Sequence, residues 1–592
     1  MTDRRNTRAA RTRVLAAICA TALVASGCTT LPRSTTPQAI RTFEAPAQEL
    51  DIPEPRPDVA PDLVLRDFYT ASAHPTDNYA AAREFLTDDA AATWNPAEST
   101  LIVDGINVIA DGPVSQGGQT FGTRGAIVGQ LGPNGAYETH TTAYEDTVRM
   151  VRGTDGQWRI AELPDGVVLE RQNFLDNNSP RNIYFLDPTG NHLVPDRRWI
   201  YRGVADASIE LLGKMQDGPR QRLAAGVSTA LPPEAGIEVI PHEGTPGKTV
   251  RLTGLGNLDQ DLRALLAAQI VWTLSSADVR GPWILEADGA PLVETHEGPW
   301  TRDSDELRYF DPAHGPADTV PLHTVDAGGL YRITQGTAEV VGEGWTTSGS
   351  ELFVSAAVGV DVTGRELIAA VSRADRGGET GSRLLLGDAD TGPREVFSAD
   401  ILTRPSWSPD GASVWTVADG DQIIRLVASS ESGQPRAEEV DMTGLVGIGG
   451  ASSELRVDAS GTQVAFIADG RIFTATIEQT TTGPWRLVNP RALNLPEGTA
   501  PVTLAWAPNS TIIVGAYGEE SPMWRLYPDG SLNYMLPKLN LSPPIAVVAA
   551  TSSKIYALDD NALMELVTGE GEEQFWRAVT GVGGRAAPVT AE

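Results

Sequence analysis

A unit of 47 to 50 residues repeats along the C-terminal half of the chain, and this repeat constrains the fold more than any other feature. In each unit a strand-like run is followed by a turn rich in Asp, Asn, Ser and Gly, and then by a second strand-like run. Successive turns fall at Gly364, Gly411, Gly461 and Ser510. A period in the forties with several strands per unit is typical of a β-propeller, in which each unit forms one blade.

A third strand-like run also recurs in these units, at 423–426, 472–475, 523–527 and 562–567, and the run 329–333 resembles it in an earlier unit. The sequence therefore predicts an all-β propeller of about six blades over residues 298–592. Closing such a ring removes the exposed sheet edges that would otherwise aggregate.

Three aspartates recur in phase with the repeat: Asp361, Asp410 and Asp458. They could be ligands of a shared calcium ion, or each could accept hydrogen bonds from the backbone of its own turn. The repetition itself favours the second interpretation, so we expect no metal site here.

The other end of the chain carries an export signal. Five arginines between positions 4 and 13 precede an apolar run from Val14 to Val24, and Ala25-Ser26-Gly27-Cys28 follows. Basic, apolar and small residues in this order are typical of a secretory signal, and Cys directly after small residues is the bacterial lipobox. We expect a signal peptide at 1–27, cleavage between Gly27 and Cys28, and S-diacylglycerol and N-acyl groups on Cys28. The alternative, a membrane-spanning helix, would need roughly 20 apolar residues.

Residues 28–59 then form a lipidated start and a tether. Six prolines between positions 32 and 57 lie among Thr, Ala and Glu without apolar periodicity. Such a segment cannot bury enough surface to fold, so we expect an extended spacer. A ligand for a proline-binding module is the alternative.

The charge of the chain limits its partners. The net charge is −31, and residues 1–27 carry five Arg and one Asp, so their removal leaves a charge near −35. Phosphate binding depends on clustered Lys and Arg, so no nucleic acid partner is expected, whereas a partner with a basic face is easily accommodated. Because Cys19 leaves with the signal and Cys28 is lipidated, no disulfide is expected.

Residues 60–176 are predicted to be an α+β domain in which helices precede a curved sheet. The spacing of Tyr79, Phe85-Leu86 and Trp94 resembles the cone-shaped fold of nuclear transport factor 2. Such cones can contain a catalytic pocket. Its candidate lining residues are Tyr137, His140, Tyr144 and Asp146, although alternate residues of these strands would equally face solvent.

Residues 180–293 form a second α+β domain in this interpretation. The strand with Tyr184-Phe185, the helix with Leu211-Leu212 and the break at Gly218-Pro219 resemble the GerMN domain. That resemblance implies a binding module of exported bacterial proteins without known catalysis. The segment 244–249 resembles a phosphate loop, but His242 replaces a required glycine and a strand follows, so we expect a hairpin turn.

Catalytic motifs are missing from the sequence. None of the seven histidines is spaced as a zinc pair, and neither a nucleophile elbow nor a Cys-x-x-Cys motif is present. We therefore predict that the protein is not an enzyme and has no cofactor.

The order of lipobox, tether, cone-like domain, GerMN-like domain and propeller resembles the actinobacterial lipoprotein family LpqB over nearly the whole chain. The resemblance implies attachment to the outer face of the cell membrane. It also implies a partner, the extracellular domain of an MtrB-like sensor histidine kinase in a two-component system for cell-envelope homeostasis and division. Cys28 is the only functional residue that it supplies.

Two other functions are compatible with the sequence. A binder of peptidoglycan or another cell-wall glycan would use exposed aromatic residues such as Trp345, Trp407 or Trp506, although the equivalent repeat positions of Trp407 and Trp506 indicate core residues. An exported propeller hydrolase would bring carboxylates together at one mouth of the propeller axis.

Overall fold

The computed structural model describes residues 52–115, 117–243, 246–256, 258–311, 319–346, 351–376, 379–427, 435–480, 483–568 and 573–592. The signal peptide, Cys28, the tether up to residue 51 and Gly244-Thr245 of the phosphate-loop-like segment lie outside the described residues. Residues from Ile52 to Glu592 form one compact unit, which consists of an N-terminal part, a middle part and a propeller.

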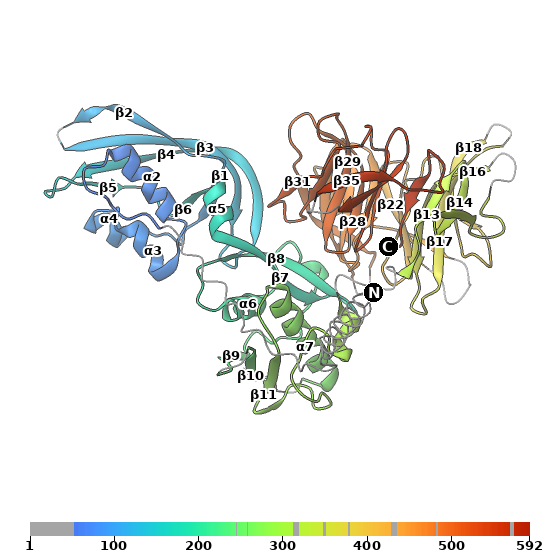
Figure 1. Ribbon diagram of the computed structural model, residues 1–592, viewed down its shortest axis with the longest axis horizontal. Helices are drawn as coiled ribbons and strands as arrows, with labels where there is room; N and C mark the ends of the chain where they lie inside the picture. Colours follow the sequence, from blue (N-terminus) through green and yellow to red (C-terminus); the bar gives the residue numbers. More distant parts are fainter. Residues whose placement is uncertain are drawn as a thin grey trace, which may run out of the picture. The chain divides into compact units, whose positions relative to one another are not determined.

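In the N-terminal part, short helices pack on a curved sheet whose order is β5-β4-β3-β1-β6, with β2 paired to β3. The elements are α2 (Pro61–Ala71), α3 (Thr76–Arg83), α4 (Asp88–Thr93), β1 (Thr100–Val103), β2 (Asn107–Ser115), β3 (Gly118–Leu131), β4 (Tyr137–Arg152), β5 (Trp158–Glu162), β6 (Val167–Glu170) and α5 (Arg171–Asn177). Helix α2 begins at a proline, which suits a first helical turn, and buries Leu65 and Phe68 against the sheet. The long β3–β4 hairpin gives this part its curvature (Figure 1).

The middle part combines the hairpin β7–β8 with the sheet β12-β11-β10-β9. Its elements are β7 (Asn178–Leu186), β8 (Leu193–Tyr201), α6 (Ala207–Gln216), η1 (Ala224–Gly226), β9 (Gly236–Pro241), β10 (Lys248–Thr253), α7 (Gln260–Ser276), β11 (Trp283–Ala287) and β12 (Ala290–Pro291). Asp259 caps α7 by accepting a hydrogen bond from the amide of Leu262.

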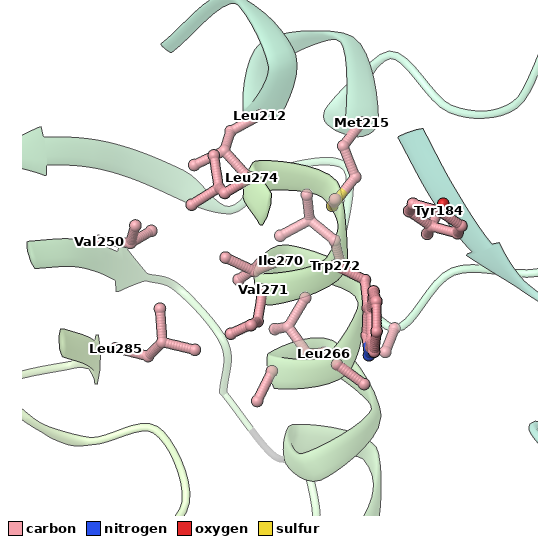
Figure 2. Packing of buried hydrophobic residues seen from close by; sticks show 14 of the residues in the cluster. Tyr184, Leu212, Met215, Val250, Leu266, Ile270, Val271, Trp272, Leu274 and Leu285 are labelled. Atoms are coloured by element: carbon pink, nitrogen blue, oxygen red, sulfur yellow. The ribbon is translucent and has the colours of Figure 1, made fainter. Parts of the chain in front are cut away.

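Helix α7 is the centre of this core. Its residues from Leu266 to Leu274 are all buried, because side chains of the sheet, of α6 and of β7 surround it, as Figure 2 shows for Val250, Met215 and Tyr184. The one amide in this run is fully satisfied: Gln269 accepts from the amide of Ala230 and donates to the carbonyl of Tyr184. A helix that is apolar all round is expected only when it is enclosed.

The described residues of the propeller form six four-stranded sheets, here called blades 1 to 6. Blade 1 contains β36 (Ala587–Val589), β13 (His323–Asp326), β14 (Gly329–Thr334) and β15 (Thr337–Val340), and blade 2 contains β16 (Glu351–Val360), β17 (Glu366–Arg376), β18 (Glu379–Gly387) and β19 (Arg394–Ala399). Blade 3 contains β20 (Ser406–Trp407), β21 (Ser413–Ala418), β22 (Gln422–Val427) and β23 (Arg436–Glu439), and blade 4 contains β24 (Ser452–Val457), β25 (Gln463–Ala468), β26 (Arg471–Glu478) and β27 (Arg486–Leu493). Blade 5 contains β28 (Ala500–Ala507), β29 (Thr511–Tyr517), β30 (Met523–Leu526) and β31 (Asn533–Met535), and blade 6 contains β32 (Val547–Ala550), β33 (Ile555–Leu558), β34 (Leu563–Thr568) and β35 (Gln574–Ala578). The predicted multidomain fold with a propeller of about six blades is confirmed.

The ring is closed by a strand from the end of the sequence. Strand β36 pairs with β13 through Val589 and His323, and through Ala587 and Val325, so blade 1 combines strands from both ends of the propeller segment. The repeat in the sequence did not predict this pairing, because β36 is short and lies outside the periodic units.

The four strands of each blade lie side by side and alternate in direction, so the propeller has two distinct faces. First strands of successive blades contact one another and line the axis, and the other three strands follow outward in chain order. Turns between first and second strands and between third and fourth strands therefore lie on one face, here called the turn face. Turns between second and third strands lie on the opposite face, and the crossings from blade to blade end there; these turns and crossings together are here called the crossing face.

One ion pair between blades 1 and 2 predicts a pH dependence of stability. His323 Nε2 lies 3.4 Å and Arg332 Nη2 2.5 Å from Glu366 Oε2, and these two groups lower the pKa of Glu366 to about 2. A carboxylate with a lowered pKa stabilises the fold above its ordinary pKa near 4.5, and this contribution is lost as the pH falls toward 2. Because the carboxylate is partly exposed, Glu366→Gln should cost on the order of 1 kcal/mol at pH 7.

Urea denaturation of the wild type and of Glu366→Gln between pH 7 and pH 3 measures this contribution. The difference between their midpoints should be constant above pH 5 and shrink below it. Glu395→Gln on β19 is the control, because its carboxylate is half exposed and lies 3.7 Å from Arg383 in the same blade. A midpoint difference that does not change with pH would contradict the assignment.

Candidate functional site

The propeller axis brings four charged side chains together. The carboxylate oxygen Oε1 of Glu454 on β24 lies 2.6 Å from Arg404 Nη2 and 2.8 Å from Arg456 Nη2. Arg456 Nη1 also lies 3.5 Å from Glu592 Oε1. Glu454 and Glu592 therefore both approach Arg456 at the axis, where the hydrolase hypothesis would require a free pair of carboxylates.

Arg404 connects several blades across the axis. Besides its bond to Glu454, it donates to the carbonyl oxygens of Leu504 on β28 at 2.9 Å and of Val548 on β32 at 3.1 Å. Arg404 itself precedes β20, so one guanidinium links the first strands of blades 3, 4, 5 and 6. Such a group holds neighbouring blades in register.

Glu592 extends this network to blade 2. Its Oε2 atom accepts hydrogen bonds from Ser406 Oγ at 2.8 Å and from the amide of Trp407 at 2.7 Å, while its amide donates to the carbonyl of Val358. Burial raises the pKa of Glu592 to about 7 and also raises the pKa of Glu454. Because both carboxylates are occupied by arginines or backbone donors, the arrangement serves ring closure and offers no free acid–base pair.

The three recurrent aspartates each cap their own turn. Asp361 Oδ1 accepts hydrogen bonds from the hydroxyl of Thr363 and from the amides of Thr363 and Arg365. These bonds, the hydroxyl bond most of all, lower the pKa of Asp361 to about 2. Asp410 and Asp458 accept from the amides of their own turns in the same way. The turn interpretation is therefore confirmed. Within the described ranges, no group of three His, Cys, Asp or Glu side chains is arranged to hold a metal ion.

The tryptophans proposed to bind glycans are mostly core residues. Trp345 is fully buried and Trp407 is 6 % exposed, while Trp506 is half-buried. The indole N–H of Trp407 donates to the carbonyl of Ala357 in the preceding blade, and that of Trp506 donates to the carbonyl of Arg456. The core position that the repeat indicates for Trp407 is therefore confirmed. Trp345 offers no exposed ring either, because its indole N–H donates to the carbonyl of Asp388 in blade 2.

Of the residues proposed for a pocket in the N-terminal part, Tyr144 and Asp146 lie within range of an electrostatic interaction, but the four side chains do not share one environment. Tyr137 and Tyr144 are buried in its core, and burial raises the pKa of Tyr137 to about 12. His140 is exposed, and Asp146 accepts a hydrogen bond from the amide of the next residue. Tyr137 and Tyr144 therefore belong to the core, whereas His140 faces solvent.

The segment that resembles a phosphate loop leads into a strand, as expected. Strands β9 and β10 pair as an antiparallel hairpin in which Lys248 lies opposite Pro241. Lys248 Nζ lies 2.6 Å from both carboxylate oxygens of Asp206, so its charge is already paired. In its described residues, 246–249, the segment has neither the helix N-terminus nor the free lysine that phosphate binding needs.

One surface was not anticipated from the sequence. Of the ten exposed large apolar side chains in the described part of the propeller, eight lie on the crossing face or at strand ends that reach it: Val340, Leu352, Val354, Ile401, Val446, Tyr517, Met535 and Leu539. Val362 lies on the turn face, and Tyr534 lies within β31. A concentration of apolar side chains on one face is typical of an interaction surface.

The crossing face is also acidic. Its described connections expose nine acidic side chains and two basic ones, Lys538 and Arg585. The acidic residues are Glu343, Asp400, Asp419, Asp421, Asp469, Glu497, Glu519, Glu520 and Asp560. The surface therefore suits a partner that combines apolar and basic groups. The acidic character of this face is visible only in the folded propeller, where successive turns alternate between its two faces. In the sequence these residues are scattered over more than 200 positions.

Comparison with known proteins places this architecture in a family. A protein named Lipoprotein LpqB from Corynebacterium jeikeium is 36 % identical over 96 % of this chain and 95 % of its own. A Lipoprotein LpqB from Rhodococcus opacus is 33 % identical over 95 % of each chain. The chain belongs to the LpqB lipoprotein family.

Family models match the three parts of the chain separately. The N-terminal domain of Lipoprotein LpqB matches residues 54–175, a model described as sporulation and spore germination matches 182–293, and the Lipoprotein LpqB β-propeller domain matches 328–591. Among solved structures, the periplasmic gluconolactonase PpgL of Pseudomonas aeruginosa aligns with a TM-score of 0.31 and 11 % identity, over 45 % of this chain and 99 % of that one. A likeness of that degree carries no argument about activity.

As a lipoprotein, this LpqB family member is held at a membrane by its lipid. Within the part of the chain that the structure describes, every helix is too short or too polar to cross a bilayer.

The axial network predicts the effect of one substitution on stability. Glu454→Gln should lower the free energy of unfolding by about 3 kcal/mol, because it leaves the charges of Arg404 and Arg456 facing each other without their carboxylate. Urea denaturation followed by tryptophan fluorescence measures the change. Glu145→Gln is the matched control, since it breaks an exposed pair with Arg124 and should cost less than about 1 kcal/mol. Equal costs for the two variants would show that the axial network contributes little.

Proposed function

We propose that the protein is a lipid-anchored accessory subunit that binds the extracellular domain of an MtrB-like sensor histidine kinase from the outer face of the cell membrane and modulates its signalling. The family resemblance suggests this partner. The observation that supports a binding role most directly is the crossing face, where exposed apolar side chains and an excess of acidic side chains occur together. No catalytic role is assigned to any residue.

In this proposal the protein is attached to the membrane through lipid on Cys28. Two acyl-bearing groups on Cys28 would hold the protein stably, since stable anchoring takes more than one short acyl chain. Confinement to the layer that contains the kinase domain would raise the effective concentration of the partner, so a weak direct contact would be sufficient.

Cysteine replacement tests the anchor. Cys28→Ala should abolish incorporation of labelled fatty acid and leave the signal peptide uncleaved, as read by mass spectrometry of the intact protein. Cys19→Ala is the control, because Cys19 lies within the expected signal peptide and should be dispensable for acylation. Label retained by Cys28→Ala would mean that the lipid is attached elsewhere.

Substitutions on opposite faces of the propeller test the binding surface. Val446 on the crossing face is 86 % exposed and Val362 on the turn face is 90 % exposed, so both can be replaced by Asp without loss of core packing. Val446→Asp should weaken binding of the mature chain to the purified extracellular domain of the kinase by about tenfold, because it places a charge in an apolar contact. Val362→Asp should change the affinity by less than about twofold.

Titration by isothermal calorimetry at physiological salt gives the affinities. Equal losses for the two variants would remove the crossing face from the proposal. If the mature chain does not bind the kinase domain at all but is retained by purified cell wall, the glycan-binding alternative replaces the kinase partner.

A further inference from the structure

In blades 3 to 6, the turn between the second and third strands carries exposed acidic side chains. Radial repetition places the equivalent turns of successive blades side by side around the axis. The carboxylates of these turns therefore follow one another along the crossing face, and together they are here called the acidic arc. Its members are Asp419 and Asp421 in blade 3, Asp469 in blade 4, Glu519 and Glu520 in blade 5, and Asp560 in blade 6.

The acidic arc is not neutralised by the described part of the chain. None of its carboxylates forms an ion pair with a described Arg or Lys, whereas Asp361 on the turn face pairs with Arg365 at 3.2 Å. Two basic residues lie beside the arc in the sequence, Arg471 and Lys538. The guanidinium of Arg471 lies over the ring of Phe473, 5.2 Å from its centroid. The arc therefore keeps a negative charge that a basic partner would offset.

Exposed apolar side chains lie directly beside these carboxylates in blades 3 and 5. In blade 3, two hydrogen bonds of 2.9 Å join Ile401 to Asp419: the amide of Asp419 donates to the carbonyl of Ile401, and Asp419 Oδ1 accepts from the amide of Ile401. In blade 5, Tyr517 is the last residue of β29, and Glu519 and Glu520 follow it closely. Both Ile401 and Tyr517 are more than half exposed.

The crossing into blade 4, which carries the exposed Val446, ends between two acidic turns. It leads to Ser452, whose amide donates to the carbonyl of Gly420 in the turn of blade 3 at 2.8 Å. On its other side, a Cβ atom added to Gly450 would lie 2.6 Å from Cβ of Asp469 in the turn of blade 4. The end of this crossing is therefore packed between the two turns.

The crossing into blade 6 contacts its acidic turn in the same way. It carries the exposed Leu539, and the carbonyl of Ser542 accepts a hydrogen bond from the amide of Asp560 at 2.9 Å. Blades 3 to 6 thus each combine an exposed apolar side chain with acidic turn residues, and backbone contacts hold the crossings against the turns. A surface that is ordered before it binds loses less conformational entropy on binding.

We propose that the arc of blades 3 to 6 binds a basic amphipathic segment of the partner polypeptide. Lys or Arg side chains of this segment pair with the acidic arc, and its apolar side chains pack on Ile401, Val446, Tyr517 and Leu539. The inference rests on the proposed function, since it names the kind of segment through which the kinase domain contacts the crossing face. Exposed charges at an interface act mainly on the rate of association, and buried apolar contacts act mainly on the rate of dissociation.

Two fourfold variants of the mature chain test the inference. The arc variant combines Asp421→Asn, Asp469→Asn, Glu519→Gln and Glu520→Gln, whose carboxylates accept no hydrogen bond from the described residues, so the fold should be kept. The matched control variant removes the same number of exposed carboxylates from the N-terminal part, through Glu84→Gln, Glu98→Gln, Asp104→Asn and Asp111→Asn. Both variants therefore change the net charge equally and differ only in where they change it.

Binding kinetics with the purified extracellular domain of the kinase, measured by surface plasmon resonance, compare the two variants. At about 50 mM salt, where screening is weak, the arc variant should associate about tenfold more slowly than the wild type and dissociate at a rate within about threefold of it. The control variant should associate within about twofold of the wild type. Equal association rates for the two variants would overturn the inference, because net charge alone would then explain the kinetics.

Two peptides separate this inference from the proposed function. A helix-forming amphipathic peptide of Leu and Lys should bind the mature chain in a calorimetric titration, and the arc variant should weaken its affinity about tenfold more than the control variant does. A peptide of Leu and Glu with the same pattern should not bind. If the kinase domain does not bind but the Leu and Lys peptide binds at the arc, the proposed partner is overturned and the arc is supported. If the kinase domain binds and the arc variant changes neither its kinetics nor the affinity of the peptide, the arc is overturned and the proposed partner stands.

Discussion

Closure of the propeller ring is the constraint on which the rest of the structure depends. Each blade exposes its sheet faces until its neighbours cover them, and blade 1 is incomplete until β36 pairs with β13. The residues after β36 then reach the axis, where Glu592 binds Ser406 and Trp407 of blade 3. The same short segment therefore completes a blade and contributes to the charged network that links the first strands. Loss of the pairing between β36 and β13 would expose a sheet edge in blade 1.

The axial network illustrates why buried charges are tolerated in such a ring. Two arginines and two carboxylates on the axis are costly to desolvate, and mutual pairing offsets most of that cost. In exchange, the bonds have fixed directions: Arg404 reaches carbonyl oxygens on β28 and β32 only when blades 3 to 6 are in register. An apolar axis would pack equally well in several registers, so the charged groups specify one arrangement more than they stabilise it.

The sequence predicts those features of the fold that depend on local chemistry. Turn residues such as Asp361 and Gly364 act within their own turn, so the repeat identifies the blades and the aspartates are correctly interpreted as caps. Features that join distant residues could not be predicted. The pairing of β36, the meeting of Glu454 with Glu592 and the ion pair of Glu138 with Arg491 all connect segments whose separation in the sequence carries no periodic signal.

The two faces of the propeller differ in their contacts with the rest of the protein: the other two parts approach the turn face, and the crossing face is the proposed binding surface. The middle part approaches the turn face at Gly226, where an added Cβ atom would lie 2.8 Å from Thr476 Cγ2, and the N-terminal part approaches it at Asp529. Polar and charged groups fix these approaches. Among the described residues, no hydrogen bond or ion pair of this kind reaches the crossing face from the other two parts, and its apolar side chains stay exposed, as Ile401 and Val446 illustrate. Exposed apolar surface costs solubility unless a partner covers it, and the surrounding acidic side chains limit self-association and would suit the basic groups of the proposed partner.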